Sequence, residues 1–115
     1  MSASVIGILQ FAIDGVTAQQ NAVANNIANV STPGFTDTEV RFESSLANAL
    51  AGPGPATAQI TSAPSPAAPA PNANNVRLSD ELTRAQADTL HYQTITDSLN
   101  AQFRLIQGAS GGSYA

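Results

Sequence analysis

Residues 4–30 read SVIGILQFAIDGVTAQQNAVANNIANV, and this stretch decides the fold. Its apolar residues recur at alternating spacings of three and four, with Gln20 filling one position of the series. A repeat sustained over this length predicts one long helix that buries a narrow seam against a partner helix. The seam residues predicted on this helix are Ile6, Leu9, Ile13, Val16 and Val23.

A second long helix is predicted over residues 79–107, where the same alternation of four and three returns. Ser79 is suited to the N-cap, and Asp80 and Glu81 complement the helix dipole in the first turn. Gly108 is suited to the position just after the helix. The seam residues predicted on this helix are Leu82, Tyr92, Leu99, Phe103 and Ile106.

Two helices of nearly equal length predict an all-α fold, in which they form an antiparallel, coiled-coil-like hairpin. As a hypothesis, one register places Ile13 beside Leu99 and Ile27 beside Ala85. Because the seam is narrow and rich in Ala and Thr, its burial contributes less free energy than the conformational entropy lost on folding costs. We therefore expect the isolated chain to be marginally stable and to be completed by neighbouring subunits.

The segment between the helices divides by composition. Thr32-Pro33-Gly34 predicts a turn with Pro and Gly at its central positions, and all the other prolines lie in residues 52–73. An extended start and a short helix are expected before that Pro-rich stretch. The predicted divisions are 1–35 for the first helix and its turn, 36–51 for the short extended and helical piece, 52–73 for a flexible Pro/Ala-rich linker, 74–108 for the second helix and 109–115 for a flexible tail.

Composition argues against several classes of function. The chain has four Arg, no Lys and a net charge of −4, which disfavours nucleic-acid binding. It has no cysteine, which excludes thiolate zinc sites and cysteine nucleophiles. His91 is the only histidine and is expected on an exposed helix surface. We expect no enzyme activity, no catalytic or metal site, no cofactor and no small-molecule substrate.

The N-terminus lacks the basic start and uninterrupted apolar run of a secretory signal, and no stretch is apolar enough to span a bilayer. Any export is therefore expected to proceed without a cleaved signal peptide.

Residues 24–35 read ANNIANVSTPGF. This stretch resembles the N-terminal signature of flagellar rod and hook proteins, approximately A-N-N-I-A-N-x-x-T-P-G-[FY]. We call residues 24–35 the signature segment. With a second motif described next, it forms the predicted assembly motif, whose residues are Ala24, Asn25, Asn26, Ile27, Ala28, Asn29, Thr32, Pro33, Gly34, Phe35, Asn74, Asn75 and Val76.

Two further pieces resemble the FlgB-type proximal rod family. Asn74-Asn75-Val76, here called the NNV segment, is similar to the motif that precedes the C-terminal helix of that family. The ending Leu99-x-x-x-Phe103-x-Leu105-Ile106 is similar to the family's ending. One departure is Thr36-Asp37, which stands where FlgB-type proteins often carry a basic residue.

The resemblance implies a structural subunit of the bacterial flagellar basal-body rod that transmits torque and lines the export channel at its base. It implies export by the flagellar type III system and a place in the periplasmic rod. The implied partners are other rod subunits, the inner-membrane ring, export-gate and rod-adaptor proteins, and copies of the chain in a helical assembly.

Two alternatives stay open on the sequence. Another proximal-rod subunit, similar to the FlgC type, shares the signature segment. A non-enzymatic helical-hairpin adaptor or secreted binding protein also explains the paired amphipathic helices. That second alternative does not explain the ANNIAN and TPGF strings.

Overall fold

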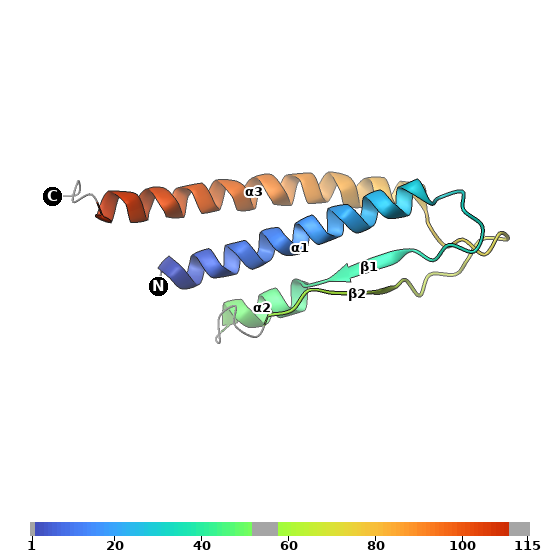
Figure 1. Cartoon of the computed structure of the whole chain (residues 1–115), viewed down its shortest axis with the longest axis horizontal. Coiled ribbons are helices and arrows are strands. Elements are labelled where there is room, and N and C mark those ends of the chain that lie inside the picture. The colour runs from blue at the N-terminus through green and yellow to red at the C-terminus, as the bar shows by residue number, and fades with distance from the viewer. Residues whose placement is uncertain (1, 52–57, 111–115) are drawn as a thin grey trace.

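The computed structural model describes residues 2–51 and 58–110, with side chains described for residues 5–51 and 58–108. Five elements follow along the chain, and Figure 1 shows their arrangement. They are α1 (Ser2–Ala28), β1 (Thr38–Arg41), α2 (Glu43–Ala51), β2 (Thr61–Pro64) and α3 (Leu78–Ser110). The predictions made for residues 52–57 and 111–115 lie outside the described residues.

The two long helices lie side by side and run in opposite directions, which confirms the long N- and C-terminal helices expected from the heptad spacing (Figure 1). The molecule is elongated, with principal extents of 67 × 25 × 14 Å. We call the end where α1 stops and α3 begins the closed end. From there the helices diverge towards the N-terminus of α1 (Figure 1). Gly108, expected just after α3, lies within it.

The prediction of an all-α fold is wrong in one respect, because β1 and β2 pair as a two-stranded antiparallel sheet. Thr38 lies opposite Pro64, and Arg41 lies opposite Thr61. The pairing continues past the strands, where the Ser65 N–H donates to the Asp37 carbonyl at 2.7 Å. Residues 61–64 were expected within a flexible linker, and the structure places a strand there. Pro64 is tolerated because it lies at the strand end, where its missing N–H is not needed.

The core lies along α1, which is covered by α3 on one side and by β1 and α2 on the other (Figure 1). Phe42, between β1 and α2, is buried and meets the Phe11 ring edge-to-face at a centroid distance of 6.3 Å. Its ring also lies over Gly15, where an added Cβ would overlap it. Gly15, which weakens the isolated helix, therefore makes room for the largest side chain of the core. The buried apolar residues are Ala12, Val16, Val23, Phe42 and Ala49.

The face that α3 turns inward differs from the predicted seam. Its buried residues are Glu81 and Asp88, both acidic. Glu81 lies one position before Leu82, which was predicted to face inward, and Asp88 lies on the same face seven residues later, so the inward face of the helix is rotated from the predicted one. Large apolar side chains of α3 are at least one-third exposed, namely Leu78, Leu82, Leu90, Tyr92, Phe103, Leu105 and Ile106.

The hypothetical register of the hairpin is also corrected. It places Ile27 beside Ala85, but the neighbouring Asn26 donates a hydrogen bond to Glu81 at 3.3 Å. The two helices are therefore displaced along their axes by somewhat more than one helical turn relative to the hypothesis. Ile13 and Leu99, predicted to face each other, are both half-buried.

Candidate assembly site

The chain leaves α1 through a hydrogen-bonded turn made by the signature segment. The Phe35 N–H donates to the Thr32 carbonyl at 3.3 Å, which closes a four-residue turn. Pro33 and Gly34 occupy its two central positions, and Gly34 has a φ of 76°. A positive φ at the third position identifies a type II turn, and Pro33 and Gly34 hold the central positions expected from the sequence. No neighbouring atom lies within 4 Å of a Cβ added at Gly34, so the requirement for glycine comes from the backbone alone.

Asn29 stabilises the end of α1. Its side-chain amide donates to the Asn25 carbonyl at 2.8 Å, and its Oδ1 accepts from the Thr32 hydroxyl at 3.1 Å. The Thr32 N–H donates to the Asn29 carbonyl at 3.0 Å. These bonds satisfy backbone and side-chain groups that the helix end leaves without intrahelical partners. Asn25 itself is exposed.

Asn26 is fully buried and links three elements. Its Nδ2 donates to the Thr38 carbonyl at 3.0 Å, and its Oδ1 accepts from the Thr38 N–H at 3.0 Å. The side chain thus pairs with one residue of β1 as a neighbouring strand would. The same Nδ2 donates to Glu81 of α3 at 3.3 Å. Asn26 therefore fixes β1 and α3 against α1 at one point.

The NNV segment contacts the signature segment directly. The buried Asn74 donates through Nδ2 to the carbonyls of Asn29 and Thr32, both at 2.8 Å. Its Oδ1 accepts from the Val76 N–H at 2.7 Å. The backbone adds a bond of 2.9 Å, in which the Gly34 N–H donates to the Asn72 carbonyl. Two motifs that are far apart in the sequence therefore meet at the closed end.

Asn75 extends these contacts to the sheet. Its Oδ1 accepts from the Asp37 N–H at 2.6 Å, and its Nδ2 donates to the carbonyls of Ser65 and Ala67, each at 3.1 Å. Its backbone N–H donates to the Phe35 carbonyl at 3.3 Å. Four side chains thus hold the closed end together with neutral amide bonds. We call them the asparagine cluster, and they are Asn26, Asn29, Asn74 and Asn75.

A group of charged side chains lies beside the asparagine cluster. The fully buried Glu81 accepts at 3.1 Å from Arg84, whose guanidinium also lies 3.6 Å from the buried Asp37. Burial, followed by a hydrogen bond with Asp37, raises the pKa of Glu81 to about 7. Oδ1 of Asp37 finds no donor among the described residues, and a protonated Glu81 carries the O–H group that such an oxygen needs.

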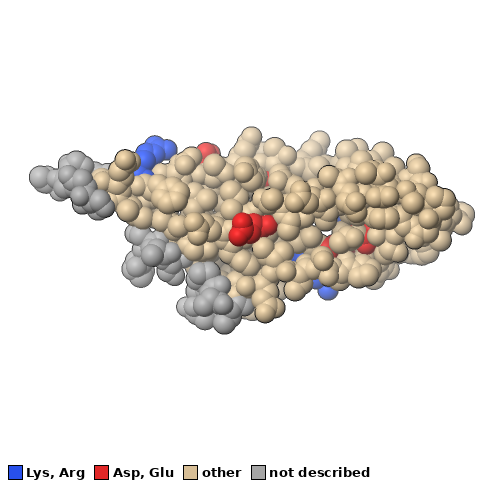
Figure 2. Space-filling model, in the orientation of Figure 1, with Lys and Arg blue, Asp and Glu red and all other residues tan. Residues whose placement is uncertain are grey.

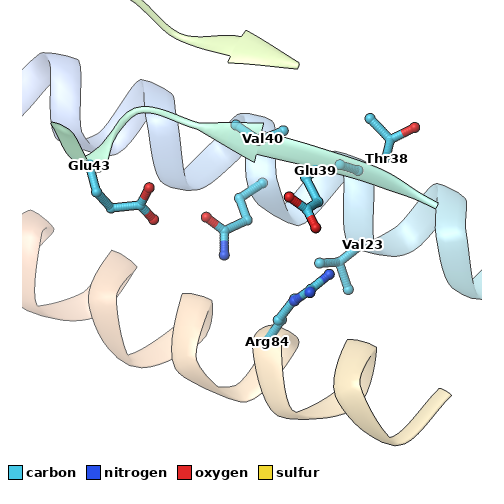
Figure 3. A pocket seen from close by; sticks show the side chains of 8 residues that line it. Val23, Thr38, Glu39, Val40, Glu43 and Arg84 are labelled. Carbon is cyan, nitrogen blue, oxygen red and sulfur yellow. The ribbon is translucent and has the colours of Figure 1, made fainter. Parts of the chain in front are cut away.

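A shallow pocket of about 220 Å³ opens next to these charged groups. Arg84 reaches into it from α3 towards Glu39 of β1, while Glu43 lies farther along the same wall (Figure 3). The described residues that line it include carboxylates, an Arg and a Gln but no Ser, Cys or His. The described residues also contain no group of three His, Cys, Asp or Glu placed to hold a metal ion.

The structure places the predicted site residues in two groups. The assembly motif lies at the closed end, and its exposed members are Ala24, Asn25, Ala28, Thr32, Pro33 and Gly34. Of the predicted helix seam, Val16 and Val23 are buried, and Ile6, Leu9, Ile13 and Leu99 are half-buried. Leu82, Tyr92, Phe103 and Ile106 are exposed.

Sequence reasoning missed Asp37, Ser65, Glu81 and Arg84 as members of the site. Asp37 was noted only as the residue standing where related proteins often have a basic one, and Glu81 was assigned to the helix dipole. A sequence signal did exist, because Glu81 and Asp88 are seven residues apart and therefore share a helix face.

Comparison with known proteins gives one family match, over part of α1 and the turn that follows it. Residues 9–36 match the family model described as flagella basal body rod protein. The match runs from the first half of α1 through the Pro33-Gly34 turn, and it confirms the resemblance to flagellar rod proteins predicted from the signature segment. No curated protein matches the chain. Among the described residues, no helix combines the length and apolar character required to cross a membrane.

Proposed function

We propose that this flagellar rod-family chain is a structural subunit of the proximal rod of the basal body, of the FlgB type. One observation carries the proposal: the asparagine cluster joins the signature segment to the NNV segment by direct hydrogen bonds. The first motif resembles rod proteins in general, and the second resembles the FlgB type. Their contact makes them parts of one structural unit.

The shape of the molecule supports a role in packing against neighbours. Two long helices run along an elongated body, and α3 leaves large apolar side chains such as Leu82 and Phe103 exposed. Exposed apolar surface of this kind marks sites of protein association. Such a subunit would transmit torque through helix-to-helix contacts and line the export channel at the base of the rod.

The proposed partners follow from that position. They are other rod subunits, copies of the same chain in a helical assembly, the inner-membrane ring, and export-gate and rod-adaptor proteins. The proposed location is the periplasmic rod, reached by flagellar type III export without a cleaved signal peptide. The proposed role requires no nucleic acid, cofactor, small-molecule substrate or catalysis.

Asp37 departs from the family pattern, and its surroundings explain how the fold accommodates it. FlgB-type proteins often carry a basic residue in this region. If that basic residue makes a charged contact at the surface, this chain lacks the contact. Asp37 is instead buried, 3.6 Å from Arg84, and its backbone N–H is bonded to Asn75. The fold therefore accommodates an acidic residue at this position, with its side chain buried at the closed end.

The proposal is tested by quantitative mass spectrometry of purified hook–basal bodies after a stringent wash. We expect this chain to be retained in a fixed ratio to the inner-membrane ring protein. A strain lacking the chain should yield rings without an attached rod. Loss of the chain in the wash, with rods intact in the deletion strain, would favour the adaptor alternative.

The level within the rod needs a second measurement. Site-specific photocrosslinking from the exposed Leu82 should capture an inner-membrane ring or export-gate protein if the chain lies at the rod base. Capture of only distal rod subunits would instead favour a position similar to that of the FlgC type or beyond it.

A further inference from the structure

An apolar groove of about 340 Å³ lies over α1 between α2 and α3. Leu9 and Val16 of α1 line its middle, Leu46 and Leu50 of α2 line one side, and Ile95 of α3 lines the other. Leu50 is 65% exposed although it faces this apolar surface. Three helices that leave a groove between them present the surface on which a fourth helix packs.

The C-terminal end of α3 carries apolar side chains that are exposed. Figure 1 shows α3 continuing beyond the N-terminus of α1, after the two helices have diverged. In this region Phe103 is 49% exposed, Leu105 is 56% exposed and Ile106 is 37% exposed. Phe103 and Ile106 are three residues apart and therefore lie on one face of the helix. The end of α3 thus presents apolar side chains that no helix covers within residues 2–51 and 58–110.

The end of α3 cannot fill the groove of its own chain. Ile95 forms one side of the groove, and Phe103 lies about 12 Å farther along the same continuous helix. An α-helix does not fold back over such a distance without a break, so the end of α3 can reach a groove of this kind only in another molecule.

Charge favours a second copy of this chain as that molecule. The surface carries few charges, and they are widely separated on the face shown in Figure 2. Among the described residues that line the groove, Glu43 is the one carboxylate. Arg104 lies between the exposed Phe103 and Leu105 and is the last basic residue of the sequence. A helix end with one positive charge therefore matches a groove with one negative charge.

We propose that residues 103–106 of one copy dock into the groove between α1, α2 and α3 of a second copy. The inference rests on the proposed structural role and names one contact by which such subunits join. Because the two surfaces differ, the contact is heterologous, and repeating it adds copies in one direction without closing a dimer.

Disulfide crosslinking of the purified full-length chain tests the contact, since the sequence has no cysteine. A Leu50→Cys chain mixed with an Ile106→Cys chain should form crosslinked dimers under mild oxidation, and neither should do so alone. A chain carrying both substitutions should form a ladder of dimers, trimers and larger species. A Leu90→Cys chain is the matched control, because Leu90 is as exposed as Leu50 but lies outside the groove.

Charge reversal gives an independent readout that leaves the core untouched. Glu43→Arg or Arg104→Glu alone should reduce crosslinking, and the two changes together should restore it. Equal crosslinking of Ile106→Cys with Leu50→Cys and with Leu90→Cys, or no rescue by the double reversal, would overturn the proposed contact.

The two proposals fail separately. A chain that is retained in washed basal bodies but shows no selective crosslink would overturn the groove contact and leave the rod assignment intact. A chain that crosslinks selectively but is absent from basal bodies would overturn the rod assignment and leave the contact between copies.

Discussion

Single asparagine side chains account for much of the order at the closed end. Asn26 illustrates this, because one amide satisfies both backbone groups of Thr38 and also bonds Glu81. A hydrogen bond adds only about 1 kcal/mol net, but a buried group left without its partner costs about 1–3 kcal/mol. Asn26 and Asn29 of the signature segment are therefore explained within one subunit before any contact between subunits is considered.

We expect Asn26→Ala to lower the free energy of unfolding by roughly 2–4 kcal/mol, because it leaves buried groups of Thr38 and Glu81 without donors or acceptors. Urea unfolding followed by circular dichroism measures this loss. Asn25→Ala is the matched control, because Asn25 is exposed on the same helix and should change stability by less than about 0.5 kcal/mol. Equal effects of the two substitutions would contradict the assigned role.

Glu81 gives the chain a pH-dependent stability of defined sign. Its pKa is about 7 in the folded chain against an ordinary value of 4.5, so between these values the folded chain binds more protons than the unfolded one. The free energy of unfolding should therefore fall by roughly 3 kcal/mol as pH rises from 4.5 to 7, and the Glu81 contribution should then level off.

Glu81→Gln should remove most of that slope, because its amide donates a hydrogen bond at every pH. Any remaining slope of the same sign is assigned to Asp88, whose pKa is also raised by burial. Urea unfolding at several pH values between 4 and 8 measures both. Asp80→Asn serves as the control, since Asp80 is exposed and adjacent. A slope in Glu81→Gln as steep as that of the unaltered chain would rule out this assignment.

The helices and the sheet were not equally predictable. Both long helices follow from heptad spacing, and the Pro33-Gly34 turn follows from its residues. The strand β2 reads TSAP within a Pro/Ala-rich segment, so no local preference indicates it. Its order comes from pairing with β1 and from Asn75, which bonds the Ser65 carbonyl. The sheet thus depends on tertiary contacts, which cannot be predicted from the spacing of apolar residues.

The orientation of α3 was missed for a related reason. Periodicity assigns apolar residues to the inside, whereas α3 turns Glu81 and Asp88 inward. Glu81 is held there by Asn26 and Arg84, which are polar partners supplied from α1 and from α3 itself. A hydrogen-bonded polar pair across two helices does not change the spacing of apolar residues. The inward face of α3 therefore could not be predicted without knowing that Asn26 bonds Glu81.

The packing of α1 against Phe42 gives a prediction with two opposing terms. Gly15→Ala should favour the helix by about 1 kcal/mol, but its Cβ would overlap the Phe42 ring, and overpacking costs about 1–3 kcal/mol. We expect a net loss of stability, measured by thermal unfolding. In a Phe42→Leu background the smaller side chain relieves the overlap, so the same Gly15→Ala change should become neutral or stabilising. A stabilising effect in the unaltered background would contradict the close packing.

As a whole, the molecule is far from spherical. Its radius of gyration is 18.0 Å, whereas a compact chain of this length would have a value of about 13 Å. Small-angle X-ray scattering of the dilute monomer should therefore give a value near 18.0 Å. A value near that of a compact chain would show that the helices collapse in isolation and extend only on assembly. A reversed Glu43/Arg104 double variant should give the same value, since neither side chain is part of the core.

The contact between Asn29 and Asn74 also constrains when the chain can fold. A ribosome releases the N-terminus first, at about 5–20 residues per second, so α1 emerges well before the residues that secure its end. Until α3 has been synthesised, the first helix lacks its main partner, and helices in proteins draw most of their stability from such tertiary packing. The closed end therefore forms late, after most of the polypeptide has been made.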